Sequence, residues 1–398
     1  MRKLNILFIS YASGGGGAER CLFDLVSQIN TQKFNVYVNT PYNDELNREL
    51  RKNNINCTVS VVYRWIPSRE VWGIKHLFNF FKSLRVRIWS IETKIENLNI
   101  DLVYSNTITC IDGAIAAKRM GVPHIWHVHE NVVGNCSLKS YLPISLTYKI
   151  ARLFCTDFIV VSKAVAHHLI GSGINIYPIF NGVDFEKFSI KKNNSLKNEL
   201  GLTESTHIIG QVGALMPAKG FMTFIEAAEA LLTSTLNKEL AFILVGSGSN
   251  EYTEVIKNKI AESLFPHHFY LLGQRENIPE IMNELDILVL ASKSEGLSRV
   301  VIEAMAVGKP IVATRCGGPE EIIVDNETGF LVPVGDTRAI AERVKLLIDD
   351  SELASQMGRK GRQRVKEHFS MEKYISSIEQ VITKTIATYL PQEDFSNT

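Results

Sequence analysis

The sequence predicts an α/β protein built from two doubly wound domains, on three observations. Of its 398 residues, 45% are hydrophobic and 21% charged, as in packed globular chains, which excludes a disordered or fibrous protein. A domain takes roughly 100–200 residues, so two are expected. Short apolar runs alternate with amphipathic helical patterns along the chain, which is typical of βαβ units with parallel sheets between helices.

Each short apolar run predicts one buried strand, and each amphipathic pattern between runs predicts a helix. Strands are expected at 5–10, 35–39, 102–105, 124–128 and 158–162, and again at 207–212, 241–245, 269–272, 287–291 and 311–314. Helices are expected at 18–29, 74–98, 221–232, 300–307 and 339–349, among others. The chain therefore contains two βαβ series rather than one.

The boundary between the two series is predicted near 181–184, where a turn signal precedes a polar stretch at 191–198. We expect an N-terminal domain over 1–182 and a C-terminal domain over 183–372. A helix at about 373–390 is expected to pack back onto the first. Ligands of such sheets bind beyond the carboxyl ends of the strands, so we expect the domains to face each other across a ligand-binding cleft.

Charge is divided unevenly between the two halves of the chain. Residues 1–190 hold 21 Lys and Arg against 14 Asp and Glu, while residues 191–398 hold 22 against 28. The formal net charge of +1 is therefore a cancellation of +7 and −6. A basic half suggests an anionic partner, such as a phosphate-bearing ligand or a membrane surface.

Targeting features point to the cytoplasm. The six cysteines form no CxxC pair, which favours free thiols in a reducing compartment. The N-terminal apolar run is too short for a signal peptide, and no run approaches the ~18–20 residues of a membrane span. We expect a cytoplasmic protein that works at the inner face of the cell membrane.

The densest chemical signal lies at 290–323. Glu295 follows a strand, and Glu303 lies one turn into an otherwise apolar helix. Burying an unpaired carboxylate costs on the order of several kcal/mol, so Glu303 needs hydrogen-bond donors. The vicinal hydroxyls of a ribose supply two donors, and Glu295 can reach a second sugar. The alternative is that Glu303 pairs with an internal Arg or caps a neighbouring helix.

Strand-end loops supply candidate phosphate contacts. Lys219 stands just before a helix after a strand, where backbone amides and the helix dipole favour anions. Glycine turns at 246–248 and 317–318 allow close approach of a nucleotide. The glycines at 14–17 lack the GxGxxG spacing and the Lys-Ser/Thr of a P-loop, which disfavours NAD binding and ATP hydrolysis.

Two histidines end a predicted strand. Strand alternation directs His127 and His129 to one face, with His129 nearer the carboxyl end. No third ligand stands at a suitable spacing for zinc, so no metal site is predicted.

With these motifs in place, the sequence resembles the family 4 glycosyltransferases, retaining enzymes of the GT-B fold. The block EGLSRVVIEAMAVGKPIVAT with GGPEEI is similar to that family's E-x7-E signature, and GGGGAER, PHIWHVHE, NGVD and TGFLVPVGD follow the family's order. The resemblance implies transfer of a sugar from a UDP- or GDP-linked donor to a glycan or lipid-linked acceptor, in surface polysaccharide or glycolipid assembly. It implies no cofactor and no metal.

The resemblance also implies roles for individual residues. It assigns Glu303 to the donor ribose, Glu295 to the transferred sugar and Lys219 to the diphosphate, with His129 near the reaction centre. Catalysis is assigned to His129, Lys219 and Glu295. The predicted donor-binding set further includes backbone and loop positions: Gly16, Gly17, Gly213, Arg275, Gly296, Leu297, Ser298, Gly317 and Gly318. Where the family usually has a second cationic Arg, this chain has Ala214.

The acceptor is expected on the N-terminal domain. Residues 62–95 hold seven Lys and Arg against two acids, with three of the four tryptophans. On the helix at 74–98, one apolar stripe is predicted to be core: Ile74, Leu77, Phe78, Phe81, Leu84, Ile88, Ile91, Ile95 and Leu98. Off that stripe, a mixed aromatic and basic set is predicted at the surface: Phe80, Val86 and Trp89 with Lys82, Arg85 and Arg87.

A basic and aromatic surface of this kind suits an anionic bilayer or a lipid pyrophosphate. Nucleic acid is disfavoured, because no recognition motif accompanies the charge. Two other interpretations stay open: a GT-B-like sugar-nucleotide epimerase, which the E-x7-E block disfavours, and a nucleotide-sugar-binding scaffold that has lost catalysis, which Ala214 suggests. Donor hydrolysis or transfer separates them.

Overall fold

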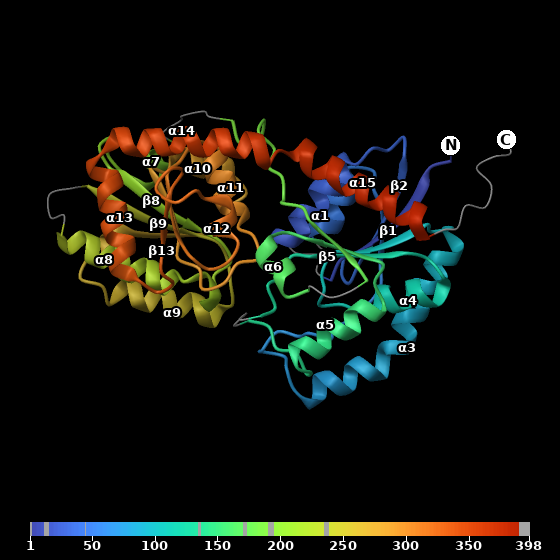
Figure 1. Ribbon diagram of the computed structural model, residues 1–398. Coiled ribbons are helices and arrows are strands. Elements are labelled where there is room, and N and C mark those ends of the chain that lie inside the picture. The colour runs from blue at the N-terminus through green and yellow to red at the C-terminus, as the bar shows by residue number, and fades with distance from the viewer. Residues whose placement is uncertain are drawn as a thin grey trace. The chain divides into compact units, whose positions relative to one another are not determined.

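The computed structural model describes residues 2–11, 16–43, 45–133, 137–169, 173–189, 195–234 and 239–389 (Figure 1). The chain divides into two compact units. The first comprises Met1–Gly182 with Glu372–Thr398, and the second Val183–Met371. Each unit has its own parallel sheet, so the prediction of two parallel α/β domains is confirmed.

The first unit contains, in the described residues, a seven-stranded sheet in the order β3-β2-β1-β4-β5-β6-β7. The strands are β1 (Leu4–Ile9), β2 (Phe34–Thr40), β3 (Asn56–Val59), β4 (Leu102–Ser105), β5 (His124–Val128), β6 (Asp157–Val160) and β7 (Asn175–Pro178). The helices are α1 (Gly17–Gln28), α2 (Glu45–Lys52), α3 (Ile74–Asn97), α4 (Asp112–Met120), α5 (Ile144–Leu153), α6 (Lys163–His167) and α15 (Met371–Tyr389).

The C-terminal helix α15 is tied to the first unit by side chains far apart in sequence. Glu379 accepts a hydrogen bond from the Asn30 amide at 2.8 Å, and Thr385 donates to the Asp157 carboxylate at 2.6 Å. Residue 390, the predicted end of this helix, lies outside the described residues, as does the stretch 191–194.

The second unit contains, in the described residues, a six-stranded sheet in the order β10-β9-β8-β11-β12-β13. The strands are β8 (His207–Val212), β9 (Leu240–Val245), β10 (Phe269–Gly273), β11 (Ile287–Leu290), β12 (Ile311–Thr314) and β13 (Phe330–Val332). The helices are α7 (Ser195–Leu200), η1 (Pro217–Lys219), α8 (Phe221–Ser234), α9 (Asn250–Ala261), η2 (Pro266–His268), α10 (Ile278–Glu284), α11 (Arg299–Ala306), α12 (Pro319–Ile322), α13 (Thr337–Asp349) and α14 (Ser351–His368).

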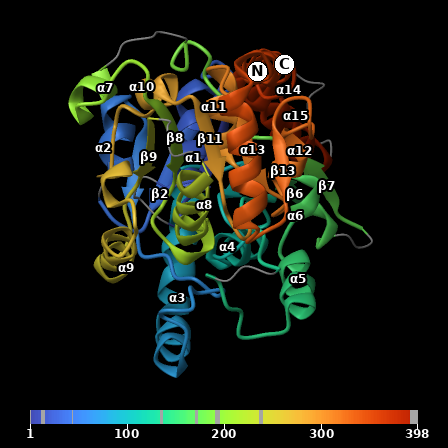
Figure 2. The ribbon, with the colours of Figure 1, turned by 90° about the vertical axis from the view of Figure 1, so that its left-hand side faces the viewer.

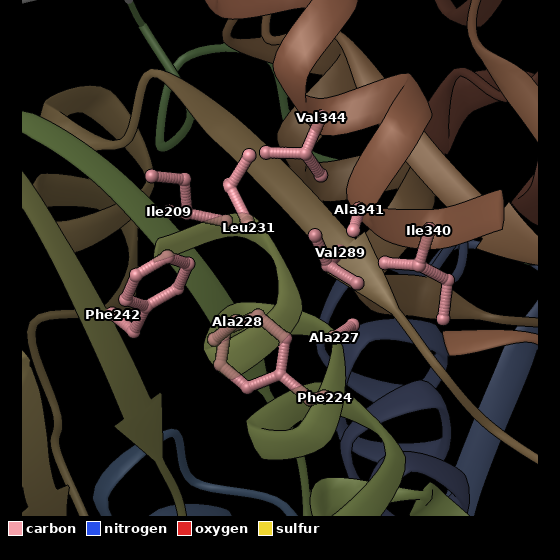
Figure 3. A pocket seen from close by; sticks show the side chains of 10 residues that line it. All are labelled: Ile209, Phe224, Ala227, Ala228, Leu231, Phe242, Val289, Ile340, Ala341 and Val344. Carbon is pink, nitrogen blue, oxygen red and sulfur yellow. The ribbon is translucent and has the colours of Figure 1, made fainter. Parts of the chain in front are cut away.

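The core of the second unit lies between its sheet and the helices α8 and α13, which pack side by side (Figure 2). Figure 3 shows a small gap in this core. Ten apolar side chains line it: Ile209, Phe224, Ala227, Ala228, Leu231, Phe242, Val289, Ile340, Ala341 and Val344. Because no polar side chain lines the gap, it offers a polar ligand no hydrogen bond and is a feature of packing.

Three strands were not predicted from the sequence: β3, β7 and β13. The first two are edge strands whose side chains are mostly exposed or half-buried, so they lack the continuous apolar run that marks a buried parallel strand. The third has three residues, too few for a period to show.

The predicted core stripe of α3 is wrong in its first half. Ile74, Phe78 and Phe81 are 88%, 64% and 62% exposed, whereas Phe80, predicted at the surface, is buried. The N-terminal half of α3 projects from the unit in Figures 1 and 2, and its C-terminal half packs against α4. No helix within the described residues is long and apolar enough to cross a membrane.

Arg87, also predicted at the surface, is buried. Its Nε donates to Asp112 Oδ2 at 2.7 Å and its Nη2 to Oδ1 at 3.1 Å, with side chains 2% and 0% exposed. Its Nη1 donates to the Phe80 carbonyl at 2.9 Å. The pair locks α3 to the first turn of α4, and its position on the Phe80 side of α3 explains why that side faces inward.

Candidate active site

The sheet order places the predicted site residues of the second unit at one point. From β8 the chain builds outward through β9 and β10, then returns to add β11, β12 and β13 on the other side of β8. The order thus reverses between β8 and β11, where ligands of open α/β sheets bind at the carboxyl ends. Lys219 follows β8 and Glu295 follows β11, so the two residues flank this switch point.

Backbone hydrogen bonds join the loops beyond these strands into one surface. The Lys293 amide donates to the Ala218 carbonyl at 2.8 Å, which ties the loop after β11 to η1 after β8. The Glu295 amide donates to the Cys316 carbonyl at 2.9 Å, which ties it to the loop after β12.

Two glycines allow these loops to approach so closely. Gly220 has a φ of +69°, and a Cβ there would overlap the Ala291 carbonyl. At Gly318 a Cβ would overlap the backbone of Gly296 and Leu297. A side chain at either position would push the loops apart, so the glycines preserve the geometry of the site.

The central contact of the site is an ion pair between the two residues that flank the switch point. Lys219 Nζ lies 2.7 Å and 2.9 Å from the carboxylate oxygens of Glu295, whose side chain is 7% exposed. Ser292 Oγ donates to Glu295 Oε1 at 2.7 Å, and Gln211 Nε2 donates to the Lys219 carbonyl at 2.7 Å. The cation and the carboxylate that the sequence assigned to separate parts of the donor therefore neutralise each other.

Glu303 is paired with an internal arginine, the alternative left open by the sequence. Arg299 stands one turn earlier on α11, and its Nε lies 3.5 Å from Glu303 Oε1. The two side chains are 16% and 13% exposed. At this distance the pair is loose. Glu303 lies on α11, whose N-cap is Ser298, and Glu295 lies in the loop that precedes this helix.

The amides of Gly317 and Gly318 already donate hydrogen bonds. Gly317 N–H donates to the Glu320 carboxylate at 3.0 Å, and Gly318 N–H donates to the Glu295 carbonyl at 3.1 Å. A ligand anion would reach the Gly317 amide only by displacing Glu320, whose carboxyl has a pKa raised by burial. Sequence reasoning missed Glu320, although the acidic pair in GGPEEI was a visible signal.

The two remaining predicted positions of this unit, Gly213 and Arg275, lie in different places. Gly213 lies beside the aliphatic stem of Lys219, within the site. Arg275 instead forms an ion pair with Glu199 of α7 and donates to the Leu272 carbonyl at 3.3 Å. Its described partners thus lie at the β10 end of the sheet, away from the Lys219–Glu295 pair.

The first unit has a switch point of its own, between β1 and β4, and the predicted residues gather there. Asn106, just after β4, links them: its Oδ1 lies 3.0 Å from His129 Nε2, and its Nδ2 donates to the Ala18 carbonyl at 2.9 Å. Gly16 and Gly17 begin α1 directly before Ala18, so this first turn and His129 share one network. The glycines at 14 and 15 lie outside the described residues.

The two strand-end histidines share a face, as alternation predicted, with ring centroids 4.0 Å apart. His127 is buried, lies 2.7 Å from the Tyr104 hydroxyl, and has a pKa lowered by burial. Within the described residues, no group of three His, Cys, Asp or Glu side chains is placed to hold a metal ion. Cys21, Cys57, Cys110, Cys155 and Cys316 are free thiols, and Cys136 lies outside the described residues.

Comparison with known proteins identifies both units. The family described as "Glycosyltransferase Family 4" matches residues 15–187, and "Glycosyl transferases group 1" matches residues 192–364. The chain is similar to the capsular polysaccharide biosynthesis glycosyltransferase CapM of Staphylococcus aureus, with 30% identity over 58% of this chain and 62% of CapM. It therefore spans less than two thirds of the length of that relative.

Two further similarities cover more of the chain. The UDP-Gal:alpha-D-GlcNAc-diphosphoundecaprenol alpha-1,3-galactosyltransferase of Escherichia coli is 29% identical over 71% of this chain and 74% of that protein. The crystal structure of Anabaena HepE in complex with UDP-glucose has a TM-score of 0.81 at 22% identity, covering 96% of this chain and 100% of HepE. The likeness to HepE shows the shared fold.

Proposed function

Because the chain belongs to glycosyltransferase family 4, we propose that it transfers a sugar from a UDP- or GDP-linked donor to a glycan or lipid-linked acceptor in surface polysaccharide or glycolipid assembly. The observation that carries this proposal is the Lys219–Glu295 pair at the switch point of the second sheet. The UDP-glucose complex of HepE supports a UDP-linked donor, and the lipid diphosphate in the name of the E. coli relative supports a lipid-linked acceptor.

Lys219 supplies the positive charge that the reaction needs. When the anomeric C–O bond breaks, the nucleoside diphosphate leaves with added negative charge on its terminal phosphate. A fixed ammonium at the carboxyl edge of the sheet stabilises that charge, the type of preorganised electrostatics that dominates many enzymes. Because Lys219 does this work, the reaction is proposed to need no divalent metal.

In the proposed mechanism the same ion pair also prepares Glu295 to bind the donor sugar. A diphosphate that approaches Lys219 draws the ammonium away from one oxygen of Glu295, while Ser292 keeps its hydrogen bond to Oε1. Glu295 can then accept hydrogen bonds from sugar hydroxyls. Glu303, held loosely by Arg299, is assigned to the hydroxyls of the ribose.

Retention of configuration follows if the acceptor attacks from the face that the diphosphate leaves. The acceptor oxygen forms a bond to the anomeric carbon, the bond to the phosphate oxygen breaks, and that oxygen takes the acceptor proton. No enzymic nucleophile is needed. Asn106 orients His129 for this reaction: its Nδ2 donates to Ala18, so its Oδ1 faces His129 and accepts from Nε2–H.

The exposed side of α3 is proposed to contact an anionic membrane. The apolar side chains of Ile74, Phe78, Phe81, Val86 and Trp89 are 88%, 64%, 62%, 67% and 65% exposed. The exposed cations Lys75, Lys82 and Arg85 stand among them. Apolar rings that insert and cations that meet lipid phosphates suit a bilayer with anionic headgroups, at the cytoplasmic face where the donor is available.

A binding and turnover screen tests the proposal. The chain is titrated with UDP-, GDP- and ADP-sugars, and donor hydrolysis and transfer are measured with and without EDTA. We expect one nucleotide class to bind and turn over equally well in EDTA. Release of a free epimerised sugar would favour an epimerase, and binding without turnover for every acceptor would favour a scaffold.

A further inference from the structure

The loop after β12 carries a carboxylate that the proposed mechanism does not use. Glu320 belongs to the short helix α12, and its Oε2 accepts a hydrogen bond from the Gly317 amide at 3.0 Å. The next amide is occupied too, because Gly318 N–H donates to the Glu295 carbonyl at 3.1 Å. Both amides that were predicted to bind the donor therefore already have acceptors within the protein.

The backbone holds this carboxylate close to Glu295. Glu295 and Gly317 form a parallel β-bridge, in which the Glu295 amide donates to the Cys316 carbonyl at 2.9 Å. The Cys316 thiol responds to both side chains: burial, and the negative charges of Glu295 and Glu320, raise its pKa to about 12. The two carboxylates thus act on the same point of the site, one from the loop after β11 and one from α12.

Neighbouring cations are committed to other carboxylates. Lys219 is paired with Glu295 at 2.7 Å. Burial raises the pKa of the Glu320 carboxyl and the charge of Arg315 lowers it less, but Arg315 is itself paired with Asp325 at 2.5 Å. Part of the Glu320 side chain is exposed, so a ligand can reach it. A carboxylate in this position attracts hydrogen-bond donors and repels anions.

We propose that Glu320 is a specificity-determining residue, which excludes donors whose sugar carries a carboxylate. In the proposed function Glu295 accepts hydrogen bonds from the hydroxyls of the donor sugar, and Gly317 lies beside Glu295. Because Glu320 holds the Gly317 amide, the loop offers a uronic acid no free N–H there and sets a like charge next to it. A neutral sugar is not repelled, and its hydroxyls can donate to the same carboxylate. This inference rests on the proposed function and names the charge of the sugar that the donor carries.

The contact between Glu320 and Gly317 also resembles the return bond of a capping box, in which an acidic side chain near the start of a helix accepts from a preceding backbone amide. A contact of that kind stabilises α12, and its loss changes only the stability of the fold. Recognition of the sugar instead changes the ratio of the affinities for charged and neutral donors. The experiment therefore measures both quantities.

The test compares donors that differ at one carbon of the sugar. The full chain is titrated with UDP-glucose and UDP-glucuronic acid, and with GDP-mannose and GDP-mannuronic acid, so that each pair exchanges a hydroxymethyl group for a carboxylate. We expect wild type to bind the neutral member of the accepted pair about 10–100-fold more tightly, as a like-charge contact at a partly exposed site implies. UDP and GDP are titrated alone as well, because they have the diphosphate without the sugar.

Two substitutions separate the charge of Glu320 from its hydrogen bond. Glu320→Gln removes the charge while its amide oxygen can still accept from Gly317, and it should reduce the preference to about threefold or less. Glu320→Ala also frees the Gly317 amide and should tighten binding of the uronic acid donor further. The matched control is Glu327→Gln, at an exposed acid on the same β12–β13 connection, which should keep the wild-type ratio. Thermal unfolding of each variant is measured beside binding.

Three results would overturn the inference. The first is equal affinity of wild type for both members of the accepted pair. The second is an unchanged preference in Glu320→Gln, which with a lowered thermal midpoint would show a capping role alone. The third is tighter binding of UDP or GDP alone in Glu320→Gln by the same factor as the uronic acid donor, because the charge would then act on the diphosphate.

The proposed function has a separate readout in turnover. A chain that shows the preference but neither hydrolyses nor transfers any donor refutes the proposed function alone. A chain that turns over both members of a pair with equal affinity refutes this inference alone. Binding of none of the nucleotides refutes the proposed function and this inference with it.

Discussion

Replacement of Lys219 by Met removes the proposed charge on the leaving group with little change of side-chain volume. In the structure its Nζ lies within 2.9 Å of both Glu295 oxygens, so the substitution has two effects. It removes the stabilisation of the departing diphosphate, which for a single preorganised donor is about 3–4 kcal/mol, or roughly 100–1000-fold in kcat. It also leaves the 7%-exposed Glu295 carboxylate without its cation, which costs about 1–3 kcal/mol of folding stability.

A second substitution separates these effects. In Lys219→Met/Glu295→Gln the buried charge is gone, and Ser292 can still bond the amide oxygen. The double variant is therefore expected to regain thermal stability but not transfer activity. The matched control is Lys293→Met, at an exposed lysine on the loop after β11 that also carries Glu295. It should equal wild type in both assays.

The assays are thermal unfolding and steady-state transfer from the nucleotide sugar that binds best. Activity of Lys219→Met within about threefold of wild type would refute the assignment of Lys219 to the leaving group, since that is under 1 kcal/mol. Recovery of activity in the double variant would show instead that the single variant fails through misfolding.

Three further outcomes are expected from the structure. Asp112→Ala leaves the buried Arg87 guanidinium unpaired and should lower the free energy of urea unfolding by about 3–5 kcal/mol, while Arg359→Ala, in an exposed pair with Glu352, should change it by about 0–1 kcal/mol. Burial lowers the pKa of His124 to about 3, so as the pH falls below 6.5 the imidazole takes up a proton in the unfolded chain before it does so in the folded one. The stability that neutral His124 contributes is therefore complete above pH 6.5 and about 2 kcal/mol smaller at pH 5. His124→Leu should flatten that part of the pH profile of the unfolding free energy. Phe78→Ser should weaken sedimentation with anionic vesicles about 10-fold or more, whereas Leu264→Ser, at an even more exposed apolar residue of the second unit, should not. Equal, negligible binding of wild type to neutral and anionic vesicles would remove the membrane proposal.

The ten strands predicted from apolar runs are present, with ends within two residues, because a parallel strand covered on both faces needs a continuous apolar run. Edge strands β3 and β7 are not covered in this way and left no such signal. On α3, apolar residues occupy more than one side of the helix, so periodicity did not distinguish the side that packs from the side that is exposed. The burial of Phe80 depends on Arg87 and Asp112, 25 residues apart.

For the site, residue type and spacing identified Lys219, Glu295 and Glu303, because a strand followed by a glycine-bearing loop and a helix is a local pattern. Local patterns do not specify which loops meet. The Lys219–Glu295 pair joins residues 76 positions apart, and it exists because β11 pairs with β8. The Glu320 bond to the Gly317 amide and the pairing of Arg275 with Glu199 depend on tertiary contacts in the same way.

The sequence by itself thus determined the fold class, the number of domains and the chemical groups of the candidate site, since each is written in the period and composition of short segments. The tertiary structure alone decided which of those groups are in contact and which side of α3 is exposed. These properties depend on strand order and on the burial of side chains from distant segments, and no local pattern encodes either.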